Sequence, residues 1–219
     1  MSCSIEAVLF DLDGTLLDTY DLLLSTFRHT TRKVLGEALP DEQLMAKVGQ
    51  PLVVQMWDFT DDESVHDELC RVYREHNALV HDDLIKVFPD TRDMLDRLKD
   101  AGFPLGVVTS KRHEPAMRGL DRFALAGYFD FLVGSDDWPE HKPAPGPVAR
   151  GCALLGRSPG SCLYVGDSPF DIQAGNGAGC LTAAALWGMF PRKTLVAERP
   201  TFVCGSCSEV ASLLEGGLR

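Results

Sequence analysis

The chain reads IEAVLFDLDGT from Ile5 to Thr15, an apolar run that ends in two aspartates and a glycine. Residues 5–10 are aliphatic or aromatic except for one glutamate, and the run is too short for a buried helix, which predicts a strand. Asp11 and Asp13 follow where this strand would end. Because ligands of an open parallel sheet bind beyond the carboxyl ends of its strands, the stretch predicts an acidic site at a sheet edge.

Further apolar bursts of the same kind recur along the chain, at residues 104–108, 129–133, 162–165, 181–185 and 201–203. Helical segments are expected between the later ones, at residues 91–101, 147–155 and 169–178. The first of these places Met94, Leu95 and Leu98 on one stripe and stops before Gly102, and the other two begin with proline. Alternation of strands and helices predicts an α/β fold with a doubly wound, mainly parallel sheet.

One long gap interrupts this alternation. No strand-like burst follows the first until residue 104, and residues 17–85 carry helical patterns such as Leu22, Leu23 and Phe27. We therefore expect a small α-helical cap of residues 17–85 inserted into a core made of residues 1–16 and 86–219. Asp18 and Thr19 are expected to cap the first helix of the insertion.

Polar side chains follow four of the predicted strands or the loops beyond them. These segments are Asp11-Leu12-Asp13-Gly14-Thr15, Thr109-Ser110-Lys111, Lys142-Pro143 and Gly166-Asp167-Ser168-Pro169-Phe170-Asp171. Three carboxylates, a hydroxyl and a lysine should therefore meet at one edge of the sheet, with Asp171 on the adjoining helical turn.

In order, these segments resemble the four motifs of the haloacid dehalogenase superfamily, as DLDGT, VVTSK, HKP and GDSPFD. One such motif is a weak signal, whereas four in order at strand ends are specific. The resemblance extends over essentially the whole chain, and it implies a Rossmann-like core with a helical cap of the C1 type.

The spacing of Asp11 and Asp13 suits acid–base chemistry. Residues two apart on an extended chain point to the same side, so that one carboxylate can attack phosphorus while the other handles the leaving group's proton. The resemblance implies that Asp11 is the nucleophile, which forms an aspartyl-phosphate that water then cleaves. It implies that Asp13 is the general acid and base.

Carboxylates gathered around a phosphate repel it, so the site needs a cation. We expect Mg²⁺, which prefers octahedral oxygen coordination, bound by Asp11, the Asp13 carbonyl and Asp167, with Asp171 directing a metal-bound water. Thr109, the Ser110 amide and Lys142 are expected to hold the phosphoryl oxygens, and Lys142 should also reduce the effective charge on Asp11.

The strings around Gly49-Gln50-Pro51, VVTSK and Trp187-Gly188 resemble the phosphoglycolate phosphatase group and its pyrophosphatase branch. We expect a phosphatase that acts on a small phosphomonoester such as 2-phosphoglycolate, with pyrophosphate or a sugar phosphate as alternatives. Gln50 is the expected cap contact to the substrate, although an outward-facing turn residue is equally compatible with the pattern. Thr15 and Asp13 disfavour a phosphoglucomutase-type mutase and a dehalogenase, respectively.

The motif residues also have purely structural interpretations, and two other classes of protein are compatible with the pattern. Asp13-Gly14 could be a turn, Asp167-Ser168-Pro169 a helix cap, and Lys142 a solvated loop cation. A phospho-aspartate receiver domain would also use acidic residues, a threonine and a lysine around Mg²⁺, but in a smaller chain with the acceptor on a mid-sheet strand. A catalytically inactive binding protein on the same fold is disfavoured by the intact motif residues.

Charge and composition narrow the partners. The net charge of -11 disfavours nucleic acid and anionic membrane, so the expected partner is a small phosphorylated metabolite. Seven scattered cysteines, no long apolar run and no secretory start predict a cytoplasmic protein, monomeric or homodimeric. Cys204 and Cys207 have metal-ligand spacing but lack a second pair, and we interpret them as apolar packing residues.

Overall fold

The computed structural model describes residues 4–215. A six-stranded sheet in the order β5-β4-β1-β6-β7-β8 forms its centre, and every neighbouring pair is parallel. The strands are β1 (Ala7–Phe10), β4 (Leu105–Val108), β5 (Phe131–Val133), β6 (Cys162–Gly166), β7 (Leu181–Ala185) and β8 (Phe202–Cys204). All six expected strands are present within a few residues of their predicted bounds. The predicted α/β fold is confirmed.

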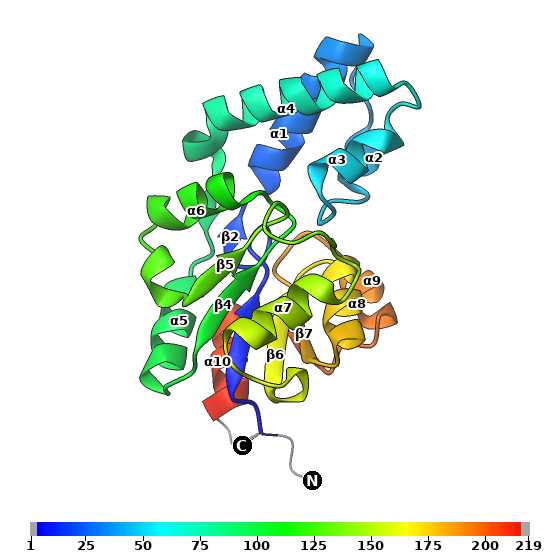
Figure 1. Cartoon of the computed structure of the whole chain (residues 1–219). Helices are drawn as coiled ribbons and strands as arrows, with labels where there is room; N and C mark the ends of the chain where they lie inside the picture. Colours follow the sequence, from blue (N-terminus) through cyan, green and yellow to red (C-terminus); the bar gives the residue numbers. More distant parts are fainter. Residues whose placement is uncertain (1–3, 216–219) are drawn as a thin grey trace.

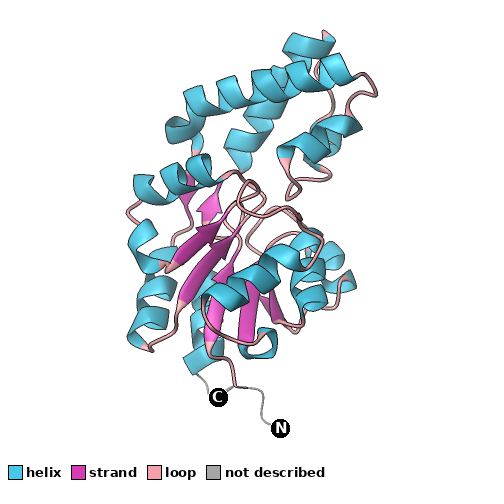
Figure 2. Ribbon diagram, viewed as in Figure 1, coloured by secondary structure: helices cyan, strands magenta, loops and turns pink. Residues whose placement is uncertain are grey.

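Alternating side chains of β1 build a hydrophobic core on each face of the sheet. Val8 and Phe10 pack with α5 (Thr91–Asp100), α6 (His113–Arg122) and α10 (Cys207–Glu215). Ala7 and Leu9 pack with α7 (Gly146–Leu154) and α8 (Pro169–Ala178). Farther along, α9 (Arg192–Ala197) covers β7 beside α8. The sheet is therefore covered on both faces, as Figures 1 and 2 show, and its polar groups can emerge only at strand ends.

The helical segment of residues 20–84 packs around a hydrophobic cluster of its own above the sheet edge. It comprises α1 (Tyr20–Leu35), α2 (Asp41–Met45), α3 (Leu52–Gln55), a 3₁₀ turn η1 (Met56–Asp58) and α4 (Glu63–Leu84). Phe27 of α1 lies against Tyr73 of α4 with ring centroids 4.9 Å apart. The division into a cap of residues 17–85 and a core of the remainder stays a prediction, and we call the helical segment the cap.

Two short strands that the sequence did not predict join the cap to the core. β2 (Leu17–Asp18) pairs with β3 (Lys86–Val87) in antiparallel fashion where the chain leaves and re-enters the core. The expectation of no strand between the first burst and residue 104 was therefore wrong. Strands of this length contain too few residues to show the alternation by which strands are recognised.

The start of α1 also differs from expectation. Thr19 occupies the N-cap position, but its side chain makes no capping hydrogen bond, and its buried Oγ1 has no partner among residues 4–215. Asp18 instead accepts a hydrogen bond from the Tyr20 amide at 3.3 Å. Capping by Thr19 was therefore a wrong prediction, because its backbone does not adopt the extended conformation of a typical N-cap.

Cys204 ends β8 and Cys207 begins α10, and both are buried in the hydrophobic core as free thiols. Their predicted role as apolar packing residues is confirmed. Among the described residues, no helix is long and apolar enough to cross a lipid bilayer.

Candidate active site

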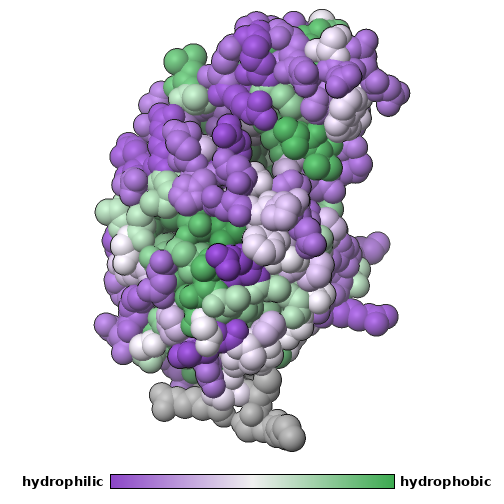
Figure 3. Space-filling model, in the orientation of Figure 1, coloured by the Kyte–Doolittle hydropathy of each residue, from purple (hydrophilic) through white to green (hydrophobic). Residues whose placement is uncertain are grey.

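The four motif segments meet at the carboxyl edge of the sheet, beneath the cap. A cavity of about 520 Å³ opens there, and its lining includes Asp11, Asp13, Thr109, Ser110 and Asp167. Gln50 of the cap also lines this cavity. Figure 3 shows a hollow between the cap and the core on the face that it presents. Both aspartates of the DLDGT segment therefore face one space, as their spacing predicted.

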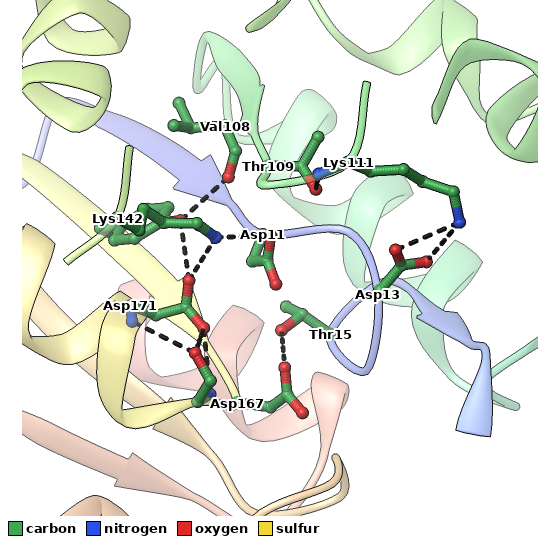
Figure 4. A network of polar contacts seen from close by, with 11 residues as sticks. Asp11, Asp13, Thr15, Val108, Thr109, Lys111, Lys142, Asp167 and Asp171 are labelled. Carbon is green, nitrogen blue, oxygen red and sulfur yellow. Dashed lines mark hydrogen bonds and ion pairs between the residues drawn. The ribbon is translucent and has the colours of Figure 1, made fainter. Parts of the chain in front are cut away.

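Lys142 is the buried centre of the site. Its Nζ lies 2.8 Å from Asp11 Oδ1 and 2.5 Å from Asp171 Oδ1, and 3 % of the residue is exposed. Burial lowers the pKa of Lys142, but attraction to Asp11 and Asp171 outweighs burial and raises it above its usual value. The lysine therefore stays charged. Its contact with Asp11 agrees with the expected effect on that carboxylate (Figure 4).

Tyr164 of β6 was not identified from the sequence. Its hydroxyl accepts a hydrogen bond from Lys142 Nζ at 3.1 Å and lies 2.9 Å from the Val108 carbonyl oxygen and 3.1 Å from Asp171 Oδ1. A tyrosine on a fully buried strand needs a hydrogen-bond partner for its hydroxyl, and this requirement could have indicated a polar contact at Tyr164. Tyr164 thus helps to fix the position of the Lys142 ammonium group.

Asp171 is held by Ser168 as well as by Lys142. The Ser168 hydroxyl and amide donate to Asp171 Oδ2 at 2.5 and 3.0 Å, and the pair forms a capping box at the start of α8. This segment can therefore serve both as a helix N-cap and as part of the site, because the Asp171 carboxylate takes part in the capping box of α8 and also binds Lys142.

Asp167 approaches the DLDGT turn closely. Its Oδ1 accepts from the Thr15 hydroxyl at 3.2 Å, and its Oδ2 accepts from the Met189 amide at 2.7 Å. Gly14 has a φ of +83°, and a Cβ at this position would lie 2.2 Å from Asp167 Oδ2. Only glycine permits this backbone conformation and this approach, so Gly14 brings the first and fourth motifs together.

Three buried carboxylates, from Asp11, Asp167 and Asp171, present oxygen atoms within 4.8 Å of one another. Burial, followed by repulsion from Asp171, raises the pKa of Asp11 to about 7, although Lys142 opposes the rise. Burial and repulsion from Asp171 and Asp11 also raise the pKa of Asp167. One lysine against three carboxylates leaves negative charge uncompensated, and oxygen donors in this number suit a divalent cation. The donor set therefore fits a metal ion.

Asp13 lies outside this acidic group. Its two carboxylate oxygens lie 3.0 and 3.1 Å from Lys111 Nζ (Figure 4). Lys111 belongs to the VVTSK segment but was not among the predicted site residues. The pair therefore places a carboxyl group and an ammonium group side by side at the cavity.

Thr109 and Ser110 follow β4, at the edge between Asp11 and Asp13. The Thr109 hydroxyl accepts a hydrogen bond from the Lys111 amide at 3.2 Å, which shapes the loop. The Ser110 Oγ is buried and has no partner within residues 4–215. A buried hydroxyl without a partner costs stability, which distinguishes this atom from the other side-chain oxygens of the loop.

The cap closes on the core at the segment that contains Gln50. Gly49 has a φ of +104°, and a Cβ there would lie 2.9 Å from the Ser168 hydroxyl. The Gly49 turn therefore rests on Ser168 and Phe170 at the start of α8, next to Asp167 and Asp171. This contact holds Gln50, which is partly buried, at the wall of the cavity.

The chain is similar in sequence to known hydrolases over most of its length. The family model described as haloacid dehalogenase-like hydrolase matches residues 8–185. A Caldanaerobacter subterraneus protein that carries the name PpaX is 38 % identical over 212 residues, which cover 97 % of this chain and 96 % of that protein. The pyrophosphatase PpaX of Anoxybacillus flavithermus is 35 % identical over 211 residues, covering 96 % of this chain and 97 % of the relative.

Solved structures show the same fold. The crystal structure of a predicted phosphoglycolate phosphatase from Haemophilus somnus superposes with a TM-score of 0.87 at 24 % identity, covering 95 % of this chain and 97 % of that one. At this level of identity the similarity establishes the shared fold, including the cap.

Proposed function

We propose that this chain, which belongs to the haloacid dehalogenase-like hydrolase family, hydrolyses small phosphate compounds through a covalent intermediate on Asp11. The family match confirms the resemblance of the four motifs and the expectation of a hydrolase. The substrate, the metal and the role of each residue are the parts that we propose.

The single observation that carries the proposal is the environment of Asp11. It follows β1 directly, lines the cavity and is bound through Oδ1 by Lys142 at 2.8 Å. Lys142 holds this oxygen and fixes the carboxylate, so that Oδ2 can approach a phosphorus atom.

The reaction follows from the placement of the two aspartates. Asp11 Oδ2 attacks phosphorus, the bond from phosphorus to the leaving oxygen breaks, and Asp13 gives that oxygen its proton. A water molecule then attacks phosphorus, Asp13 takes its proton, and the bond between Asp11 and phosphorus breaks to release inorganic phosphate. Lys111, whose Nζ lies 3.0 Å from Asp13 Oδ1, holds the Asp13 carboxyl group in place at the cavity.

The phosphoryl oxygens are held by groups with available donors. The Ser110 hydroxyl and amide and the Thr109 hydroxyl lie at the cavity edge, and Lys142 supplies positive charge beneath it. These groups are placed before the substrate arrives, which lowers the cost of charge that spreads over the oxygens in the transition state.

We further propose Mg²⁺ as the cation of the acidic group. Asp11 and Asp167 would hold it together with the Asp13 carbonyl, and Asp171, whose oxygens already accept from Lys142, Tyr164 and Ser168, would act through water. When bound, the ion supplies positive charge that offsets the repulsion between the carboxylates and the phosphate.

Pyrophosphate is the first substrate candidate, because relatives that share more than a third of their residues with nearly the whole chain are named pyrophosphatases. 2-Phosphoglycolate, expected first from the motifs, is the second candidate. Its support is the size of the cavity, about 520 Å³, and the polar groups that line it, which suit either small compound.

The test is a set of phosphate-release assays with purified protein and Mg²⁺. Pyrophosphate, 2-phosphoglycolate, several sugar phosphates and an aryl phosphate are compared by kcat/KM. We expect release from the aryl phosphate and a higher kcat/KM for pyrophosphate or 2-phosphoglycolate. Absence of release from every compound would refute the proposed hydrolysis, and a requirement for a sugar acceptor would replace it with phosphoryl transfer.

A further inference from the structure

Cationic side chains line the cavity beyond the phosphoryl site, at Arg74, Lys111, Arg112 and Arg118. Three of them are paired with acids, in the pairs Lys111–Asp13, Arg112–Asp136 and Arg118–Asp82. Arg74 is the exception, because its side chain has no hydrogen bond or ion pair to any other residue between 4 and 215. The cavity thus contains one exposed guanidinium that no acid within the described part of the chain neutralises.

The acidic residues near Arg74 on α4 form ion pairs with another arginine. Glu75 pairs with Arg71, which also binds Glu68 on the exposed side of the helix. The charge of Arg74 is therefore available to a ligand.

Arg74 belongs to a polar face of α4 that lines the cavity. Arg74, Asn77 and His81 follow one another at intervals of three and four residues, which places them on one side of a helix. His81 is 1 % exposed, and while its Nδ1 contacts Asp82 at 2.7 Å, its Nε2 has no partner within the described range. The face therefore lines the cavity with a cation that has no acidic partner among the described residues.

We propose that this face of α4 binds an anionic oxygen group on the leaving portion of the substrate, with the Arg74 guanidinium as its principal contact. The proposal rests on the phosphohydrolase function and extends it to a substrate class: phosphate compounds whose leaving group itself carries negative charge. The planar fork of arginine matches both carboxylate and phosphate, so the second phosphoryl group of pyrophosphate and the carboxylate of 2-phosphoglycolate share this chemistry.

Charge selection at this position has a physical reason. The acidic protein repels anions at long range, and the carboxylates of the phosphoryl site repel a second anionic group at short range. A neutral leaving group avoids this repulsion, whereas a charged one requires a local cation. Arg74 supplies one that no acid of the described chain neutralises.

The experiment compares charged and neutral leaving groups in matched pairs. The substrates are 2-phosphoglycolate with 2-hydroxyethyl phosphate, and pyrophosphate with methyl phosphate. The proteins are the wild type, Arg74→Gln and Arg74→Lys. Arg71→Gln is the control, because it removes the same charge one turn earlier on α4, from a side chain that does not line the cavity. Each substrate is compared with itself in two proteins, so differences in leaving-group chemistry cancel.

Arg74→Gln should lower kcat/KM by about tenfold or more for the charged member of at least one pair, corresponding to a lost charged hydrogen bond. The neutral member should change by less than about twofold. Arg74→Lys should recover part of the loss, and Arg71→Gln should have no selective effect. The pair that responds more strongly identifies which anionic group, phosphoryl or carboxylate, the face binds.

Two results would overturn the inference, and they are distinguishable. Equal changes for charged and neutral members, with the wild type active, would refute the role of Arg74 and leave the hydrolase function standing. Failure of the wild type to release phosphate from any of the four compounds or from an aryl phosphate would refute both.

Discussion

The two walls of the cavity differ in how they are built. At the sheet edge, Asp11, Lys142, Asp167 and Asp171 are at most 3 % exposed, and each has partners within the protein. On the cap wall, Arg74 is exposed and unpaired, and Gln50 is only partly buried. The four charged groups at the sheet edge are therefore fixed by the protein, whereas Arg74 on the cap wall has no partner among the described residues.

This difference separates two tasks. Groups that stabilise a transition state act best when they are already in place and shielded from water. Groups that select a leaving group can remain hydrated until the substrate binds, because their contribution is measured against competing substrates. We therefore expect changes in the sheet edge to affect every substrate and changes in the cap to affect only some.

The largest effect should come from Asp11→Asn, which keeps the size of the side chain and removes the attacking charge. Turnover should fall by several orders of magnitude for all substrates, while the circular dichroism spectrum stays that of the wild type. Asp100→Asn, an exposed change on α5, is the control. Retention of more than about a tenth of the wild-type rate would show that Asp11 is not the nucleophile.

Removal of the metal should have a similarly general effect. Dialysis against EDTA should abolish phosphate release from every substrate, and added Mg²⁺ should restore it, because three buried carboxylates otherwise repel the phosphate. Ca²⁺ should inhibit, since its larger coordination sphere disturbs the geometry of in-line attack. Full activity in chelator, with metal content checked by mass spectrometry, would contradict the proposed cation site.

Asp13→Asn should have a smaller effect that depends on the leaving group. The rate for alkyl phosphates should fall by about a hundredfold or more, because their leaving oxygen needs the proton of the general acid. The formation of the intermediate from aryl phosphates should be much less affected, since these leaving groups need little protonation. Rapid-mixing measurements of aryl alcohol release check this, and equal losses for both classes would remove Asp13 from the role.

The sheet edge could be predicted from the sequence because topology determines it. Six parallel strands place their carboxyl ends on one side, so Asp11, Thr109 and Asp167 had to meet once the strands were identified. Tyr164 was missed because it lies inside a strand, where its apolar ring explained the pattern without its hydroxyl. The pairing of Lys111 with Asp13 depends on side-chain directions in two loops, which no strand pattern determines.

The cap was less predictable, for a different reason. Its helices follow from hydrophobic periodicity, but which helical face lines the cavity depends on how α4 packs on α1 and lies over the core. Gln50 was proposed from its turn, whereas Arg74 on the following helix carried no local signal. Likewise, β2 and β3 could not be predicted from the sequence, because each exists only through its pairing with a segment far away in the chain.

A cap change should give the smallest effect and sharpen the contrast. Gln50→Ala should lower kcat/KM for the preferred natural substrate by about tenfold, the equivalent of one lost hydrogen bond, and leave a small aryl phosphate nearly unchanged. Gln43→Ala, an exposed cap residue of α2 outside the cavity, is the matched control. Equal effects of Gln50→Ala on both substrates, or no effect, would assign Gln50 to the structure of the turn.

The covalent attachment of phosphate to Asp11 is the central claim, and it can be observed directly. Asp13→Asn protein is mixed with an aryl phosphate and Mg²⁺, quenched in acid during turnover and digested for mass spectrometry. Since this variant lacks the base that activates water, the intermediate should accumulate, and the peptide that contains Asp11 should carry one phosphoryl group that is absent after Asp11→Asn is added. Phosphate release without any phosphorylated Asp11 peptide, or with the phosphoryl group on another residue, would contradict the account.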